Sequence, residues 1–438
     1  MTGNWESENP APILNDFCPR FLRPATERKG IDTIFNQKTL GLSCEKANKD
    51  FNSLFVLLLT VSIFFPYYVS VAAIIIIAFM TVVNYEKRAE AFRDPYSIWI
   101  VLFFVFTALV GQVYNNHIGT LYSIFTAAIL TASFYIRSFM TRQLFNSVMD
   151  TACFCSVACA VVAILQKVST FAANPSYRPM STFLNANYYG MMIEFVVLIA
   201  MYRMFTNAQN RNYYLMVIAF NLVGLYLSAS MSAAMALACA VAVMLLCRGR
   251  YRVVAVLCAL GAVVVAASFL FPEIFPRVAL IDQSWEQRLD IWRTAVKGIR
   301  RHPMFGQGAM AYQLACNEFF GYKTYHAHSL YLDTLLNYGF AGAGAIAFYL
   351  AAQVKILILR FRNNICTNMN VLLVAVGTAI LVHGFTDVTI FWVQTALLFL
   401  LIFSSTGINS EYVSLHMRQR MVLLPDYRVH TGAAYFKN

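Results

Sequence analysis

Long apolar runs recur along this chain, and most of them approach the length that a helix needs to cross a membrane. A spanning helix takes about 20 apolar residues to cover the hydrocarbon core. Charged residues make up 12% of the 438-residue chain, whereas soluble domains carry about 25%. A soluble protein with so few charges could not cover its own surface, so the excess apolar side chains must face lipid. The candidate spans are residues 51–65, 67–83, 96–114, 118–136, 148–165, 187–205, 213–230, 231–247, 253–271, 331–359, 371–385 and 391–408.

These candidate spans predict an all-α integral membrane protein with about 12 transmembrane helices and a large extracytoplasmic helical loop between spans 9 and 10. The composition excludes a cytoplasmic enzyme, a secreted disulfide scaffold and a nucleic-acid-binding domain. The predicted organisation is a cytoplasmic N-terminal segment at 1–50, spans 1 to 9 at 51–271, the extracytoplasmic loop at 272–330, spans 10 to 12 at 331–408 and a cytoplasmic tail at 409–438.

Lysine and arginine set the expected orientation, because loops rich in these residues stay in the cytoplasm. Of the 33 Lys and Arg residues, 24 fall in alternate loops and the two terminal segments, which we therefore place in the cytoplasm. The other nine are confined to two loops on the opposite side, 166–186 and 272–330. Long loops cross the membrane whatever their charge, which would account for these cations without a function. The alternative is that the two loops together bind an anionic ligand outside the cytoplasm.

The larger loop contains an amphipathic segment. Ser284 and Gln287 have the spacing of a capping box, and apolar residues then recur at helical intervals as far as His302-Pro303. The predicted helix would lie on the membrane surface or on the helix bundle. Arg293 falls on a charged flank typical of a solvated face, whereas Arg288 stands apart beside tryptophan. A guanidinium group suits a diphosphate because it can donate two hydrogen bonds at once. The apolar stripe is Trp285, Leu289, Trp292, Val296 and Ile299, and the charged flank is Arg293, Lys297, Arg300 and Arg301.

Two histidines, His326 and His328, precede the tenth span. The pair could ligate a metal, but zinc catalysis needs a third protein ligand, and neither Glu318 nor Asp333 has a suitable spacing. We expect His328 in the first turn of the following helix, where the positive helix end favours a neutral imidazole. A neutral imidazole at the membrane boundary can accept a proton from a hydroxyl group. The alternative is a histidine that only forms a hydrogen bond at a helix start.

The smaller loop carries Arg178 shortly before Asn185 and Asn187, where the sixth span begins. Asparagine is a common N-cap residue, so these two side chains are expected at the helix start. An arginine beside a helix N-terminus also makes a site for an anion. The two outer loops therefore each offer an arginine to a negatively charged ligand.

Four motifs in the second half of the chain together resemble the O-antigen ligase and polymerase superfamily. They follow one another in the family's order and with suitable spacing, and they cover most of residues 170–390. The first 150 residues match only in hydropathy. Ser230-Met231-Ser232 departs from the family pattern, because many members have Ser-Arg there, and one basic contact is therefore absent. The motifs are Arg178…Asn185…Asn187, Arg288-Leu-Asp-Ile-Trp292 with His302-Pro303 and Gly306-Gln-Gly308, His328-Ser329 with Gly339-Phe340-Ala341-Gly342, and His383-Gly-Phe-Thr-Asp387.

The resemblance implies a glycosyltransferase of bacterial surface polysaccharide assembly, for lipopolysaccharide or capsule, that uses no metal and no other cofactor. It implies that an acceptor hydroxyl attacks a glycan carried on undecaprenyl diphosphate, at the outer face of the cytoplasmic membrane, and that the lipid diphosphate leaves. His328 would be the base, and Arg288 and Arg178 would bind the diphosphate. Further contacts to diphosphate or glycan are expected from Asn185, Asn187, His326 and Arg293.

The resemblance also implies a set of partners. These are the lipid-linked donor, a glycan or lipid-core acceptor, the lipid bilayer and proteins of polysaccharide assembly, and no nucleic acid is among them. Whether the enzyme is a ligase, a polymerase or a protein glycosyltransferase is left open by the sequence.

A secondary transporter is the main alternative, since twelve spans are common in that class. Transporters usually have repeated halves and ionisable residues near the membrane midplane. Here the first six spans have no counterpart to the loop at 272–330, and Glu194 is the acidic residue that lies well inside a span. These features favour the enzyme over a transporter or a non-catalytic assembly subunit.

Overall fold

The structure is a computed structural model that describes residues 51–271 and 281–410. The predicted N-terminal segment at 1–50, residues 272–280 of the outer loop and residues 411–438 of the predicted tail lie outside the described residues. Apart from Phe51 and Asn52, the described residues belong to one compact unit, Ser53–Asn438.

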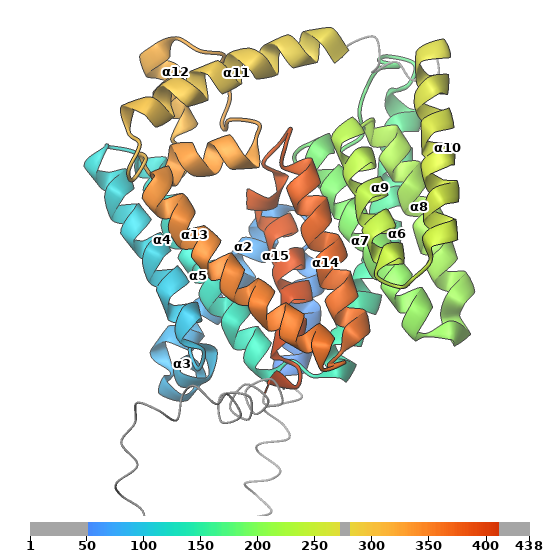
Figure 1. Cartoon of the computed structure of the whole chain (residues 1–438), viewed down its shortest axis with the longest axis horizontal. Coiled ribbons are helices and arrows are strands. Elements are labelled where there is room, and N and C mark those ends of the chain that lie inside the picture. Colours follow the sequence, from blue (N-terminus) through green and yellow to red (C-terminus); the bar gives the residue numbers. More distant parts are fainter. Residues whose placement is uncertain (1–50, 272–280, 411–438) are drawn as a thin grey trace, which may run out of the picture. The chain divides into compact units, whose positions relative to one another are not determined.

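All regular structure in the described residues is helical, as the sequence predicted (Figure 1). A helix at Phe51–Ser62 comes first. It is followed by α2 (Tyr67–Val83), α3 (Tyr85–Ala91), α4 (Pro95–Val113), α5 (His117–Phe139), α6 (Arg142–Thr170), α7 (Ala186–Thr206), η1 (Ala208–Asn210), α8 (Arg211–Ser228), α9 (Met231–Leu246), α10 (Tyr251–Leu270), α11 (Ile281–Arg301), α12 (Tyr312–Phe319), α13 (Leu330–Arg362), α14 (Thr367–His383), η3 (Thr389–Phe391), α15 (Val393–Phe403) and η4 (Ser404–Gly407).

Each candidate span coincides with a helix, but the helices differ in their fitness to cross a bilayer. By length and hydropathy, six helices in the described residues can do so, namely α4, α5, α6, α7, α10 and α13. A seventh span results if α2 and α3, bent by 104°, are taken together. Four shorter apolar helices cover Phe51–Ser62, Met231–Leu246, Thr367–His383 and Val393–Gly407. The structure thus shows a multi-helix protein suited to a membrane, and the count of twelve crossings stays a prediction.

The helix starts follow from local sequence. Asp94 accepts a hydrogen bond from the Tyr96 backbone N–H at the start of α4, and Thr141 does the same for Leu144 at the start of α6. Short polar side chains at these positions satisfy N–H groups that the first helical turn leaves without partners. Most helix starts lie within two residues of the predicted spans, but α6 begins six residues before its predicted span at 148–165 because Thr141 caps it at Arg142.

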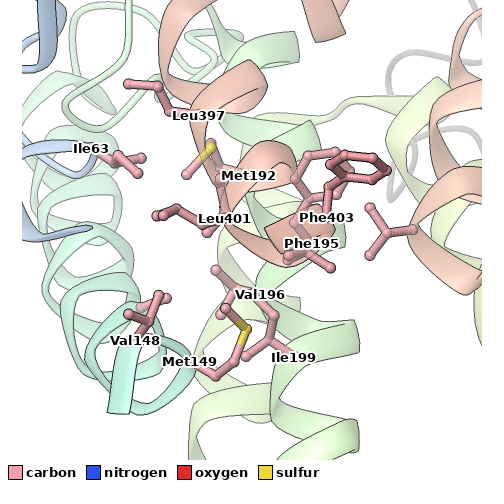
Figure 2. Close-up of a cluster of buried hydrophobic side chains, with 14 of the residues drawn as sticks. Ile63, Val148, Met149, Met192, Phe195, Val196, Ile199, Leu397, Leu401 and Phe403 are labelled. Atoms are coloured by element: carbon pink, nitrogen blue, oxygen red, sulfur yellow. The ribbon is translucent and has the colours of Figure 1, made fainter. Parts of the chain in front are cut away.

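Helix α7 occupies the centre of the main core. It packs against α6, α8, α9, α14 and α15, and nearly all its side chains between Tyr189 and Arg203 are buried. Figure 2 shows part of this core, where Met192, Phe195, Val196 and Ile199 of α7 lie near side chains of α6 and α15. Because α7 is surrounded, its first turn is held in a fixed position beside the α14–η3 turn.

Helices α11 and α12 form a small second core with the start of α13, and Figure 1 shows α11 running across the ends of other helices. The buried face of this helix is centred on Ile291, Ala295 and Ile299. Of the predicted apolar stripe, Ile299 is buried and Trp292 packs against this core, whereas Trp285 is exposed. A Cβ on Gly298 would overlap with Leu336, so α13 approaches α11 where the side chains of α11 are small. The face of α11 that is buried is therefore the one on which small side chains allow close packing, and not the one with the largest apolar side chains.

The capping-box prediction for this helix was wrong. Helix α11 begins at Ile281, so Ser284 lies inside the helix and does not cap it. The sequence between them contains neither glycine nor proline, and nothing local prevents the helix from starting earlier. The expected end of the helix is confirmed, because α11 stops at Arg301 immediately before His302-Pro303.

A break in α13 anchors the loop that follows α11. Gly339 has φ 63° and ψ −172°, which no other residue type adopts readily. A Cβ there would overlap with the backbone of Met304. The break frees the N–H of Phe340 to donate to Pro303 O at 2.7 Å. The glycine of the Gly339-Phe340-Ala341-Gly342 motif therefore lets the loop after α11 dock on α13.

Candidate functional site

Three segments that are distant in the sequence meet at one end of the core. They are the loop before α13, which carries His328, the turn after α14, which carries Asp387, and the first turn of α7, which carries Asn187. The backbone N–H of Leu330 donates to Gly384 O at 2.7 Å, which fixes the first two segments together. The site thus depends on the packing of α7, α13 and α14.

Asp387 is the centre of this site. Its carboxylate is 3% exposed and accepts hydrogen bonds from Asn187 Nδ2 at 2.7 Å and from its neighbour's backbone, Val388 N, at 2.9 Å. The Nδ1 atom of His328 lies 3.2 Å from Asp387 Oδ1. Burial raises the pKa of Asp387, but the hydrogen bond and charge of His328 outweigh it and hold that pKa below its ordinary value. Asp387 is therefore an ionised acceptor inside the protein.

His328 is not where the sequence suggested. Ser329 is the N-cap of α13, so His328 precedes the helix instead of lying in its first turn. Its backbone is left-handed, with φ 45°, and its carbonyl accepts a hydrogen bond from Trp292 Nε1 at 3.4 Å. The chain turns at His328. The turn directs the imidazole to Asp387, so the electrostatic field of the helix start is not what sets its environment. The group that contacts the His328 imidazole is therefore the Asp387 carboxylate, and not the start of the helix.

The contact with Asp387 suits His328 for base chemistry. A carboxylate beside Nδ1 favours the tautomer with its proton on Nδ1, which leaves the lone pair on Nε2. Nε2 lies 3.3 Å from the Thr324 hydroxyl, so a hydroxyl already sits at the atom that would accept a proton. The side chain of His328 is 27% exposed, which leaves room for a substrate to reach it.

His326 lies beside His328, with ring centroids 4.4 Å apart. Its Nδ1 is 3.9 Å from Asp387 Oδ1, beyond a hydrogen bond, and is buried without a hydrogen-bonding partner among the described residues. Burial lowers the pKa of His326 from 6.5 to about 4, against the pull of the Asp387 carboxylate. A neutral His326 can donate or accept a hydrogen bond, but it brings no positive charge to the site at neutral pH.

The same residues have the donor chemistry of a metal site. His326, His328 and Asp387 each offer one ligand atom, and these three atoms lie within 4.8 Å of one another. Three protein ligands and one open position are typical of catalytic zinc. No third ligand is evident from the local sequence around the histidines because Asp387 lies 59 residues beyond His328. The expectation of a metal-free protein remains a prediction.

Arg178 joins the site through Asn187. Its Nη2 donates to Asn187 Oδ1 at 2.7 Å, and its Nε donates to Ser228 O at 2.8 Å. Asn185 is the N-cap of α7 and accepts from the backbone N–H of Asn187, as predicted. Ser230, in the segment that departs from the family pattern, donates to Asn187 Oδ1 at 3.3 Å. Asn187 therefore links a guanidinium group to the Asp387 carboxylate.

Arg288 and Arg293, both predicted at the site, have different surroundings. Arg288 Nε donates to Thr386 O at 3.3 Å, next to Asp387. The Thr386 hydroxyl donates to Ser232 Oγ at 2.7 Å, which holds this turn against α9. Arg293 is exposed and lines a cavity along α11 with Lys297 and Arg300. The structure thus brings Arg288 to the histidine site and leaves Arg293 outside it.

Two acidic residues were not predicted as site residues. Asp387 occurred only inside a motif, and its role requires a contact across 200 residues with Asn187. Asp333 is buried in α13 and accepts from the backbone N–H of Ala327 at 2.8 Å, which fixes the residue between the two histidines. The position of Asp333 in the first turn of an expected helix was the local signal that could have suggested this role.

Part of the chain matches a known protein family. Residues 214–349 match the model of the O-antigen ligase family, which confirms the resemblance found in the sequence. The matched region includes Arg288, His326 and His328, whereas Arg178, Asn187 and Asp387 lie outside it. No curated protein matches the chain.

Proposed function

We propose that this protein is a membrane glycosyltransferase of bacterial surface polysaccharide assembly. It transfers a glycan from an undecaprenyl-diphosphate donor to an acceptor hydroxyl at the extracytoplasmic face of the cytoplasmic membrane, with both termini in the cytoplasm. The family match at residues 214–349 supports a role in membrane glycan assembly. The observation that carries the mechanism is the 3.2 Å contact between His328 Nδ1 and the buried Asp387 carboxylate.

His328 is the base in the proposed reaction. Its Nε2 takes the proton of the acceptor hydroxyl, while the hydroxyl oxygen forms a new bond to the anomeric carbon. The bond between that carbon and the diphosphate oxygen breaks, and the diphosphate leaves with its electron pair. Asp387 stabilises the imidazolium that forms and keeps the ring in the productive orientation. The step needs no oxidant, reductant or metal.

Arg288 and Arg178 bind the diphosphate leaving group. Charge builds on the diphosphate as its bond to the sugar breaks, and fixed guanidinium groups stabilise that charge most in the transition state. In the described part of the chain, no hydrogen bond or ion pair is formed by the terminal nitrogens of Arg288, whose Nε is held by Thr386. Its fork is therefore available to a phosphate while its position is fixed.

Glycan transfer by the purified full-length protein in lipid nanodiscs tests this mechanism. We expect His328→Ala to reduce the transfer rate at least 100-fold, because general base catalysis contributes about 100- to 10,000-fold. Arg288→Gln should reduce it about 10- to 100-fold, from the loss of a charged hydrogen bond. His302→Gln is the matched control, since His302 follows α11 and packs on Tyr114 after α4, and among the described residues it forms no hydrogen bond or ion pair with His328 or Asp387. Full activity of folded His328→Ala would contradict the assignment of the base.

The acceptor requires a separate experiment. Incubation with one defined lipid-linked repeat unit and no other acceptor produces a ladder of products only with a polymerase. A ligase needs an added lipid-core acceptor and then gives a single shifted product. If proteoliposomes take up a labelled solute and no glycan transfer is detected, the enzyme hypothesis is refuted and the transporter hypothesis is supported.

A further inference from the structure

A second candidate binding site lies along α11, on a different side of the helix from Arg288. A cavity of about 560 Å³ runs beside α11 and the end of α12. Arg288 and Arg293 are five residues apart, which separates them by about 140° around a helix of 3.6 residues per turn. Arg293 therefore belongs to this cavity and not to the diphosphate site. Its lining includes Arg293, Lys297, Arg300, Phe319, Phe320 and Trp292.

Three cations converge on the cavity. Arg293, Lys297 and Arg300 line it and are all exposed. None of them forms an ion pair with any residue that the structure describes, whereas their neighbour Arg301 pairs with Glu318 at 3.7 Å. One acidic side chain, Asp290, also lines the cavity, and it accepts a hydrogen bond from Tyr322 N at 3.2 Å. The cavity therefore has an excess of positive charge available to a ligand.

Aromatic side chains form another part of the wall. Phe320 is 95% exposed and has a left-handed backbone with φ 53°, so it projects from the end of α12 with little contact. Phe319 lies 6.0 Å from Lys297 Nζ and lines the cavity. Aromatic faces beside cations suit a ligand that has apolar C–H surfaces and negative charges. Sugars that carry carboxylate or phosphate groups have both features.

The cavity is connected to the histidine site by one side chain. Trp292 lines the cavity, and its Nε1 donates to the carbonyl of His328. Trp292 thus borders both the cavity and the loop of His328, and a glycan that occupied both would lie along Trp292.

We propose that this cavity binds acidic sugar units of the glycan substrate. The inference rests on the proposed function, since it makes the cavity part of the same substrate path. It assigns the substrate class as a glycan with carboxylate or phosphate groups. Arg293, Lys297 and Arg300 bind the charges, and Phe319 and Phe320 contact the sugar faces.

Calorimetric titration of the full-length protein in neutral-lipid nanodiscs tests this site. The probe is a uronic acid tetrasaccharide, and its partner is the same tetrasaccharide with each carboxylate reduced to an alcohol. We expect the acidic form to bind at least tenfold more tightly. The triple variant R293Q/K297Q/R300Q should remove that difference, because three exposed charge contacts of about 2.5- to fivefold each multiply to more than tenfold. Arg301→Gln is the control, as Arg301 lies on the same helix but outside the cavity, and it should change affinity less than twofold.

The outcomes separate the possibilities. Equal affinity for the two tetrasaccharides, or unchanged affinity in the triple variant, would overturn the inference. A third outcome would also overturn the inference. If the protein binds phosphatidylglycerol vesicles but neither tetrasaccharide, and the triple variant loses the vesicle binding, the surface binds lipid instead. His328→Ala should bind the acidic tetrasaccharide normally. A failure of the transfer assay therefore refutes the proposed function alone, and a failure of the titration refutes only this inference.

Discussion

Replacement of Asp387 by asparagine tests the central contact of the site with a change of nearly constant volume. The carboxylate accepts from three donors, namely His328 Nδ1, Asn187 Nδ2 and Val388 N. Asparagine offers one oxygen and one NH₂ group, so at least one of these donors would face another donor. If the amide NH₂ faces His328, the imidazole proton moves to Nε2, and the atom that should accept a proton is blocked.

The expected size of the effect follows from the lost contact. A hydrogen bond to a charged group contributes about 1.5–3 kcal/mol, which corresponds to about a 10- to 100-fold lower transfer rate. Unfolding free energy should fall by about 2 kcal/mol for the same reason. Initial rates of glycan transfer at saturating donor measure the first quantity, and thermal unfolding in nanodiscs measures the second.

Asp150→Asn is the matched control. Asp150 accepts from Arg203 and Tyr214, so it is also an aspartate in a charged hydrogen-bond network. Arg203 lies 16 residues beyond Asn187 on α7, which places this network about 24 Å along the helix from the site. We expect lower stability and an unchanged rate per folded molecule. A folded Asp387→Asn protein with the rate of the wild type would refute the orienting role of Asp387.

Three further predictions follow from the described residues. The pKa of His326 is lowered from 6.5 to about 4 by burial, so between these values only the unfolded chain binds the proton, and stability should drop by about 2 kcal/mol from pH 7 to pH 5. His326→Gln should flatten this dependence in thermal unfolding, and an unchanged slope would contradict it. Gly339→Ala should lower the free energy of unfolding by about 3 kcal/mol because of the left-handed backbone at Gly339. Gly344 has open space around it, so Gly344→Ala should leave the free energy of unfolding unchanged in the same assay. EDTA should leave the transfer rate unchanged, and loss of activity restored by Zn²⁺ would make His326, His328 and Asp387 metal ligands instead.

Much of the fold could be predicted because its signals are local. Apolar runs and short polar caps lie next to each other in the chain, so each candidate span coincides with a helix and most helix starts lie within two residues of the prediction. The histidine pair and Arg288 could be predicted as candidate site residues because their side chains differ in chemistry from those of their immediate neighbours. The prediction of a capping box at Ser284 was wrong because the pattern covers only four residues and does not show that the helix begins upstream, at Ile281.

The site itself required contacts that no local pattern contains. His328 and Asp387 are 59 residues apart, and Asn187 and Asp387 are 200 residues apart. The histidine alone therefore gave no indication of the carboxylate that orients it. The same limit explains why the third potential metal ligand was missed.

The sequence by itself determined that the chain is helical, rich in long apolar segments and equipped with arginine and histidine in the loops 166–186 and 272–330, because hydropathy and capping act over a few residues. Only the tertiary structure decided which of these residues lie close together. It placed Asp387 beside His328, linked Arg178 to both through Asn187, and separated Arg293 from Arg288. Each of these outcomes depends on how close-packed helices fit against one another, and that fit is a property of the whole core.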